Sequence, residues 1–260
     1  MTGIEGFVAQ FGVAGLVGAT FALAAGGFAK GVVGFALPLI ALGMLGSFLP
    51  YEAAVALLVV PTLVSNLFQS LRNGLAAAWA SLQQFWRLNL ILVVMIVASA
   101  QLVVRLPQAV LFGLLGACIT VAGMIQLVGW VPHIAPARRR AVETGVALIG
   151  GFYGGIGGIW GPPLVIYMLA LRLPKAEMIR ALSMSFLAGS IVLFIAHLHS
   201  GVLDATTLPV SSWMVLPTLL AMWAGYRVHD RLDAAMFRRV TLVVLILAGL
   251  NLLRRALSLG

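Results

Sequence analysis

Lys30 is the residue whose type and surroundings point most directly to chemistry. It is the only charged residue between Glu5 and Glu52, and apolar residues flank it on both sides. An ionisable side chain inside apolar sequence indicates a functional site by default, because burying a charge is costly. Its ammonium group could bind an anion. The alternative is that the side chain extends to water at a helix end and only fixes the orientation of the chain.

A row of polar side chains lies within a later apolar segment. Thr62, Ser65, Asn66 and Gln69 are spaced by three or four residues, which places them on one face of a helix. They could donate hydrogen bonds to an anion, or they could bond to neighbouring helices. Both interpretations stay open at the level of the sequence.

Two glycine-rich runs, residues 26–38 and 150–163, each lead into a proline. Glycines allow tight turns, and a helix that begins there carries about half a positive charge at its N-terminus. Interrupted helices at corresponding places in two halves are typical of transporter sites, although glycines also let helices pack closely. We therefore expect a substrate site that comprises Gly27, Lys30, Gly34, Pro38, Ser65, Asn66, Gln69, Tyr153, Gly155, Gly158, Trp160, Pro163 and Ser190.

Tyr153 and Trp160 flank the second glycine-rich run. Their rings could form a wall or gate over a ligand, and Phe28 and Phe35 take the corresponding places in the first run. The alternative is that these aromatic side chains belong to a belt at the membrane surface.

Four titratable residues suggest further roles. Glu52 and Glu177 each follow a proline at a predicted helix start, where a carboxylate stabilises the helix N-terminus. Capping is the predicted role, and proton coupling is the alternative. His197 and His199 could respond to pH, but no carboxylate close in sequence supports a proton relay.

The composition identifies lipid as the solvent of this chain. Of its 260 residues 62% are hydrophobic and 9% are charged, whereas soluble domains have roughly 25% charged residues. The net charge of +9 comes from basic residues between apolar runs, so it indicates membrane orientation and not nucleic-acid binding. The apolar segments contain no cluster of catalytic or metal-binding residues and no nucleotide loop, so we expect neither an enzyme nor a cofactor. The single cysteine, Cys118, is expected to serve packing.

The hydrophobic pattern predicts an all-α, polytopic membrane protein with about ten apolar segments. With both termini outside, 13 of the Lys and Arg residues fall on the cytoplasmic side and 3 on the other. This topology leaves Arg254 and Arg255 on the outer face. The seventh segment is short enough for a broken or re-entrant helix. The segments are 7–29, 31–49, 53–71, 88–104, 108–130, 141–157, 159–171, 178–197, 208–228 and 237–255.

The sequence also matches itself at an offset of 125 residues, which aligns Pro38 with Pro163 and Ser65 with Ser190. Five segments per half is an odd number, so the two copies would have opposite orientations in the membrane, as in many secondary transporters. We expect a first transmembrane repeat over residues 1–131, a cytoplasmic linker over 132–140 and a second repeat over 141–260. At this offset Asn66 faces Ile191, so the two copies differ at the expected site.

The two glycine-rich runs, each followed by a Pro-x-x-Ala-like helix start at Pro50 and Pro174, resemble the paired signatures of the TauE/SafE sulfite exporter family. The resemblance covers nearly the whole chain. It implies an inner-membrane permease without an ATPase domain, acting on sulfite, on sulfonates such as sulfoacetate or on other small anions. An anion channel and a permease for carboxylate or fatty-acid type anions are the alternatives. The expected partners are a small anion and the lipid bilayer, and a homodimer and proton coupling are left open.

Overall fold

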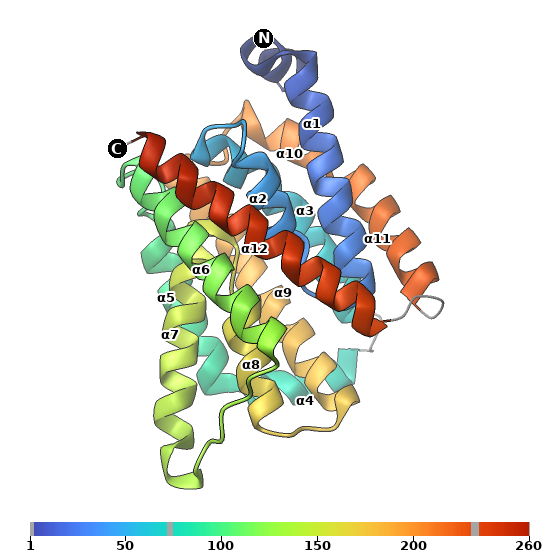
Figure 1. Ribbon diagram of the computed structural model, residues 1–260, viewed down its shortest axis with the longest axis vertical. Coiled ribbons are helices and arrows are strands. Elements are labelled where there is room, and N and C mark those ends of the chain that lie inside the picture. The colour runs from blue at the N-terminus through green and yellow to red at the C-terminus, as the bar shows by residue number, and fades with distance from the viewer. Residues whose placement is uncertain (1–2, 72–74, 230–233, 260) are drawn as a thin grey trace.

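The computed structural model describes residues 3–71, 75–229 and 234–259, and Figure 1 shows its course. Every regular element in these residues is helical, which confirms the predicted all-α class. The helices are α1 (Ile4–Val33), α2 (Leu37–Leu45), α3 (Tyr51–Leu71), α4 (Leu75–Gln84), α5 (Trp86–Ala100), α6 (Gln108–Val128), η1 (Pro136–Arg138), α7 (Arg139–Gly157), α8 (Gly161–Ala170), α9 (Lys175–Ser200), α10 (Thr207–Trp213), α11 (Val215–His229) and α12 (Ala234–Leu259).

Within the described residues, six helical stretches are long and apolar enough to cross a membrane. They lie in α1, α3, α6, α9 and α12 and across α10 with α11, while α5 and α8 are shorter apolar helices. Each of the ten segments expected from the sequence overlaps a helix. The sequence pattern missed the short helix α4 and the break between α10 and α11. Pro217 stands in the first turn of α11 and has no N–H to donate to a preceding turn, which favours that break.

Two breaks interrupt the helices at the glycine-rich runs. α1 ends at Gly34 and α7 at Gly158, and both glycines have a left-handed backbone, with φ of 93° and 69°. A short helix then begins with a proline in its first turn, Pro38 in α2 and Pro162 in α8. At each of these two places, one helix therefore ends and a second, short helix begins inside the helix bundle.

Corresponding helix ends in the two halves are separated by slightly fewer residues than the offset of 125 that the sequence matches gave. Gly158 lies 124 residues after Gly34 (158 − 34), and α9 begins 124 residues after α3 (175 − 51). The offset of 125 is thus one residue too long at these helix ends. At 124, Asn66 aligns with Ser190 and not with Ile191.

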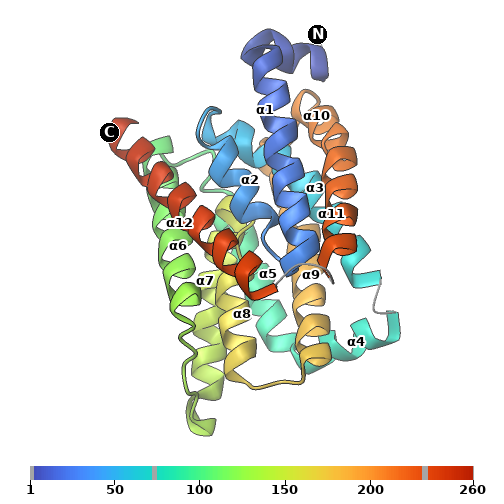
Figure 2. The ribbon, with the colours of Figure 1, turned by 45° about the vertical axis from the view of Figure 1, so that its right-hand side comes forward.

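Glycines bring two pairs of helices into backbone contact. On α1, a Cβ atom added at Gly27 would meet the Thr218 carbonyl of α11. On α7, a Cβ added at Gly155 would lie 2.5 Å from the Ile96 carbonyl oxygen of α5. The close-packing interpretation of these two glycines therefore applies. Two further contacts complete the core, α3 against α9 and α6 against α12, and Figure 2 shows α1 beside α11 and α12 running across α6.

Pro61 stands inside α3, where it cannot donate to the carbonyl of Leu57 four residues earlier. The Ser211 hydroxyl of α10 donates to this carbonyl over 3.2 Å. A neighbouring helix thereby satisfies the acceptor that the proline left free, which a spanning helix requires in lipid.

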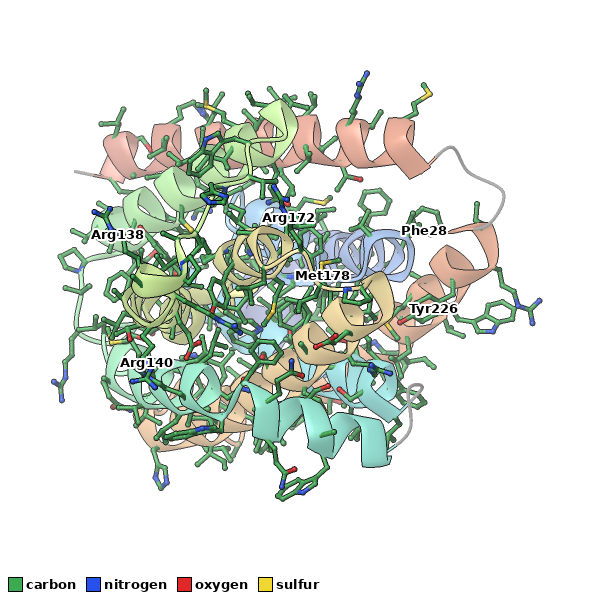
Figure 3. All side chains as sticks on the ribbon, turned by 90° about the horizontal axis from the view of Figure 1, so that it is seen from below. Phe28, Arg138, Arg140, Arg172, Met178 and Tyr226 are labelled. Carbon is green, nitrogen blue, oxygen red and sulfur yellow. The ribbon has the colours of Figure 1, made fainter. Side chains whose placement is uncertain are left out.

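The chain ends and the basic loops lie at opposite ends of the molecule. α1 begins and α12 ends toward the upper end in Figures 1 and 2. The segment before α7 and the loop between α8 and α9 lie at the lower end. Figure 3 views this lower end and labels Arg138, Arg140 and Arg172 on it, and all three side chains are exposed.

Candidate functional site

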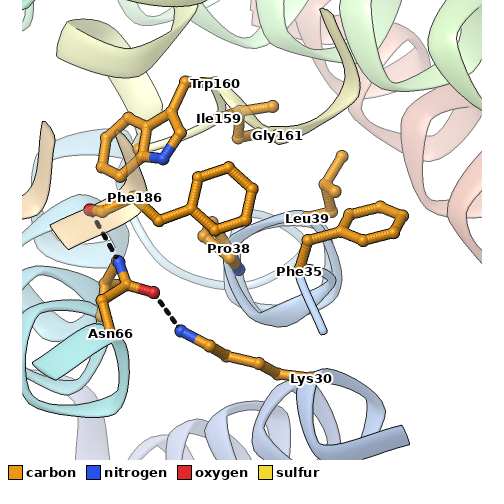
Figure 4. Close-up of a pocket in the computed structure, with 11 residues that line it drawn as sticks. Lys30, Phe35, Pro38, Leu39, Asn66, Ile159, Trp160, Gly161 and Phe186 are labelled. Carbon is orange, nitrogen blue, oxygen red and sulfur yellow. Dashed lines mark hydrogen bonds between the residues drawn. The ribbon is translucent and has the colours of Figure 1, made fainter. Parts of the chain in front are cut away.

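A pocket lies where the two helix breaks meet α3 and α9. About 290 Å³ of space lies between its lining atoms, and part of this space is open to solvent. Figure 4 shows the side chains around it. They come from both halves of the chain and are Lys30, Phe35, Pro38, Leu39, Thr62, Asn66, Gly158, Ile159, Trp160, Gly161 and Phe186.

Lys30 is buried, with 2% of its surface exposed. Its ammonium nitrogen donates to the Ser65 hydroxyl over 2.9 Å and to the side-chain oxygen of Asn66. The side chain therefore does not extend to water at a helix end, and that alternative is wrong. Lys30 instead reaches from α1 to the polar face of α3 (Figure 4).

Both acceptors of Lys30 are fixed in that role by hydrogen bonds of their own. The Ser65 hydroxyl donates to the Thr62 carbonyl over 3.0 Å, and the Asn66 side-chain nitrogen donates to the Phe186 carbonyl over 3.1 Å. The oxygens of Ser65 and Asn66 are thus left to accept from Lys30. Asn66 connects three helices, because its amide bonds to α1 and α9 from α3.

Neither partner of Lys30 carries a charge. In the part of the chain that the structure describes, its hydrogen bonds go to a hydroxyl and an amide, and no carboxylate lies within ion-pair distance. A buried cation without a counter-ion is costly in an apolar interior. The site therefore has an unmatched preference for negative charge.

Thr62 adds a free donor to the pocket. Its hydroxyl is buried and has no hydrogen-bond partner among the residues that the structure describes, and its side chain lines the pocket. Because an unpaired buried hydroxyl costs free energy, such groups are satisfied in most proteins. A bound oxyanion would accept the hydrogen bond that Thr62 leaves unmade.

Two helix N-termini also meet the pocket. Pro38 and Leu39 from the first turn of α2 line it, as does Gly161, the first residue of α8. Helix N-termini carry partial positive charge, which attracts anions. Pro162 and Pro163 have no N–H, so the first turn of α8 offers fewer donors than that of α2.

The rest of the pocket wall is apolar. The rings of Phe35, Trp160 and Phe186 lie around the space, with Trp160 opposite Lys30 in Figure 4. Trp160 is 2% exposed and is the residue before the first turn of α8. Apolar rings lower the local dielectric constant and thereby strengthen the electrostatic interactions beside them.

Five residues of the expected site line the pocket, namely Lys30, Pro38, Asn66, Gly158 and Trp160. Ser65 and Gln69 lie behind them: Ser65 accepts from Lys30, and the Gln69 amide donates to the Gly34 carbonyl over 3.0 Å. Gly34 is therefore part of the break but not of the pocket wall.

The other expected residues lie elsewhere. Gly27 and Gly155 pack against neighbouring helices, and Ser190 donates within α9 to the Leu187 carbonyl over 2.9 Å. The Tyr153 ring contacts the ring of Phe152 at 5.3 Å between centroids. Pro163 stands in the first turn of α8 but does not line the pocket.

The pocket is also lined by six residues that were not among the expected site residues, namely Phe35, Leu39, Thr62, Ile159, Gly161 and Phe186. One signal could have found Phe186. At the offset of 124 residues set by the helix ends it corresponds to Thr62, which lies on the polar face of α3. The offset of 125 placed Phe186 one position away from that match.

The carboxylates and histidines lie outside this pocket. Glu52 is exposed in the first turn of α3, and Glu177 accepts from the Gln84 amide over 2.7 Å. His197 is buried near the other end of α9, while His199 is exposed. No three His, Cys, Asp or Glu side chains among the described residues are grouped to hold a metal ion.

A comparison with protein-family models finds that the sulfite exporter TauE/SafE model matches residues 18–252. The chain belongs to the TauE/SafE family. Neither the search of curated proteins nor that of solved structures found a match. This TauE/SafE protein is therefore a member of a family of membrane transporters, and the match includes every residue that lines the pocket.

Proposed function

We propose that this TauE/SafE protein is a secondary transporter of the cell inner membrane that moves a small anion such as sulfite, sulfoacetate or another organosulfonate. The pocket beside Lys30 is its binding site. One observation carries the proposal: a buried lysine with only neutral partners borders a pocket formed by two helix N-termini. A lysine, a free hydroxyl and two helix ends together favour an oxyanion.

We further propose that the two halves are inverted repeats. The described contacts between helices are reciprocal, which supports this proposal. α1 packs against α11 as α7 packs against α5, and α3 and α6 pack against their counterparts α9 and α12. Two copies related by a two-fold axis in the membrane plane would produce such reciprocal contacts.

Counterflow in liposomes tests the transport proposal. Purified protein is reconstituted into vesicles loaded with unlabelled sulfite, and uptake of labelled sulfite is measured against a panel of sulfonates and carboxylates. A transporter accumulates label transiently by exchange, whereas a channel conducts without exchange. No exchange with any anion of the panel refutes the proposal.

Lys30→Met tests the binding site, because methionine keeps a long apolar side chain but removes the amino group. Arg254→Met is the matched control, since Arg254 is exposed and bonds to Asn251 of its own helix. We expect Lys30→Met to reduce exchange at least tenfold and Arg254→Met to leave it unchanged. Equal exchange by the two variants would show that the anion does not bind beside Lys30.

A further inference from the structure

We infer that Lys30 carries a proton together with the anion, so that the transporter moves one proton with each monoanion. This inference rests on the proposed anion transport. It identifies the second ion of the same site and follows from the hydrogen bonds around the Lys30 nitrogen.

The Lys30 nitrogen has two protein acceptors whose directions are fixed. Ser65 and Asn66 accept from it because their own donors are used by the Thr62 and Phe186 carbonyls. A neutral amine has two N–H groups and one lone pair, whereas an ammonium group has three N–H groups. The two acceptors therefore satisfy the neutral amine fully and leave the ammonium with one unpaired N–H.

The third position on this nitrogen has no acceptor among the described protein groups, and Lys30 lines the pocket. With the pocket empty, the third position is best occupied by a lone pair, because an unpaired charge is costly in an apolar interior. With an anion in the pocket, a third N–H gains an acceptor and the charge gains a counter-ion. Anion binding and protonation therefore favour each other.

The proton transfer balances without another reactant. The lone pair of the Lys30 amine takes a proton from a hydronium ion that enters from the side of the anion, a new N–H bond forms, and water is left. On the other side, release of the anion leaves the ammonium unpaired, and the proton returns to water. A monoanion and a proton together carry no net charge, so the transport cycle is electroneutral.

The helices packed against α1 carry other titratable side chains, which are located as follows. Neither α2 nor α10 has a titratable side chain. On α3, the Tyr51 hydroxyl donates to the Ile156 carbonyl over 2.9 Å and Glu52 is exposed. On α11, Arg227 lies over the Trp223 ring, and the backbone of Tyr226 lies beside Gly31. Among the described side chains of α12 the charged groups are Arg239, Arg254 and Arg255, of which Arg239 and Arg254 are exposed.

His197 is the competing proton carrier. It is buried in α9 near the Gly155 backbone, and its Nδ1 atom lies 3.3 Å from the Ser200 hydroxyl. It does not line the pocket, so its protonation would not pair directly with a bound anion. It therefore supplies the matched control for Lys30.

Proteoliposomes with a trapped pH indicator test the inference. The probe is methanesulfonate, which stays fully ionised at neutral pH, so every proton that moves is carried by the protein. We expect wild-type protein to move one proton per methanesulfonate, with a flux that does not respond to membrane potential. If only sulfite is exchanged, the protons that sulfite itself carries are measured in protein-free titrations and subtracted.

Two variants assign the proton. In Lys30→Arg the side chain stays charged, so whatever anion flux remains should carry no proton and should respond to membrane potential. His197→Gln should keep the wild-type ratio of protons to anions. Loss of proton movement in His197→Gln but not in Lys30→Arg overturns the assignment to Lys30.

The two proposals fail in different ways. Wild-type exchange without proton movement overturns proton coupling and leaves anion transport standing. Absence of exchange with methanesulfonate, sulfite and the rest of the panel overturns the transport proposal and proton coupling together. The wild-type ratio decides whether a proton moves with the anion even if Lys30→Arg does not insert into the membrane, and a loss of proton movement in His197→Gln still overturns the assignment to Lys30.

Discussion

Asn66 contributes to the pocket through both ends of its amide group. The oxygen accepts from Lys30 and the nitrogen donates to the Phe186 carbonyl, so one side chain sets the distance between α1, α3 and α9. An amide also gives Lys30 no counter-ion, whereas a carboxylate at this position would provide one. On the proposed function, the residue type at position 66 would therefore determine whether the site attracts anions.

Asn66→Asp tests this role with almost no change in volume. The new carboxylate would form an ion pair with Lys30 and repel an anion, so we expect the KM for sulfite exchange to rise at least tenfold. Counterflow measures the effect. Asn251→Asp, beside exposed Arg254, is the control and should exchange normally. An unchanged KM in Asn66→Asp would place the anion away from Lys30.

Thr62→Val removes the unpaired hydroxyl and keeps the shape of the side chain. If this hydroxyl donates to the anion, its loss should weaken binding by about tenfold, or about 1.4 kcal/mol. The protein should not lose stability, because the hydroxyl has no partner in the empty pocket. Sulfite binding and thermal unfolding in detergent measure the two effects.

Ser185→Ala is the matched control for Thr62→Val. Ser185 is also fully buried, and its hydroxyl also lacks a partner, but it does not line the pocket. We expect no change in sulfite binding. Equal effects of the two substitutions would indicate a general response to altered packing.

The sequence predicted part of this site for a physical reason. The spacing of the polar residues placed Thr62, Ser65 and Asn66 on one face of α3, and Lys30 stood alone in apolar sequence. Glycine patterns were less informative, because the same residue serves a left-handed turn at Gly158 and backbone contact at Gly27. Only the three-dimensional arrangement separates these two uses.

Among the helices, α2 is held at both ends. Its N-terminus borders the pocket, and at its other end the Arg255 guanidinium donates to the Gly46 carbonyl. The same guanidinium lies 4.6 Å from the centre of the Phe112 ring. Cations near helix C-terminal carbonyls are stabilising. The predicted topology places Arg255 on the outer face, where the positive-inside rule does not favour an arginine. This contact gives the residue a structural role there.

Arg255→Met tests the anchoring of α2. We expect a loss of about 1 kcal/mol in stability together with reduced exchange, since the first turn of α2 would be less firmly placed. Thermal unfolding in detergent and counterflow provide the readouts. Arg254→Met, on the neighbouring residue, should match wild type in both. If Arg255→Met also matches wild type, the guanidinium does not position α2.

Helix boundaries were predictable where apolar length decides them and not where packing does. The stretch 208–228 is one apolar segment in the sequence, yet the helix is interrupted between Trp213 and Val215. α4 was missed because a helix of 10 residues is too short to give a membrane-spanning signal. Pro217, near the start of α11, favours the first of these features, and an apolar-length criterion takes no account of it.

For the whole molecule, the distribution of basic residues predicts which end faces the cytoplasm. The exposed side chains Arg138, Arg140 and Arg172 lie at the lower end, and the loop before α10 is outside on the predicted topology.

In that loop, the Thr206 hydroxyl and the N–H groups of Thr206 and Thr207 bond to Asp204 and lower the pKa of its carboxyl to about 2. Asp204 is therefore charged at neutral pH.

Cysteine labelling tests this orientation. In a Cys118→Ala background, a cysteine at exposed Ala135 should react with an impermeant thiol reagent only after the membrane is opened. A cysteine at exposed Ala205 should react in intact cells. Labelling of both positions from the same side contradicts the proposed topology.

The glycine contacts have a mechanical consequence for a carrier that must open alternately to the two sides of the membrane. Gly27 joins α1 to α11 with backbone against backbone, and Gly155 joins α7 to α5 against the Ile96 carbonyl and the Ser99 hydroxyl. Each seam fastens a helix from one half of the sequence to a helix from the other. If the two halves rocked as separate blocks, both contacts would have to open, so we expect each moving unit to contain helices from both halves. Spin labels placed across the α1–α11 seam should report one fixed distance while labels on α2 and α9 report two.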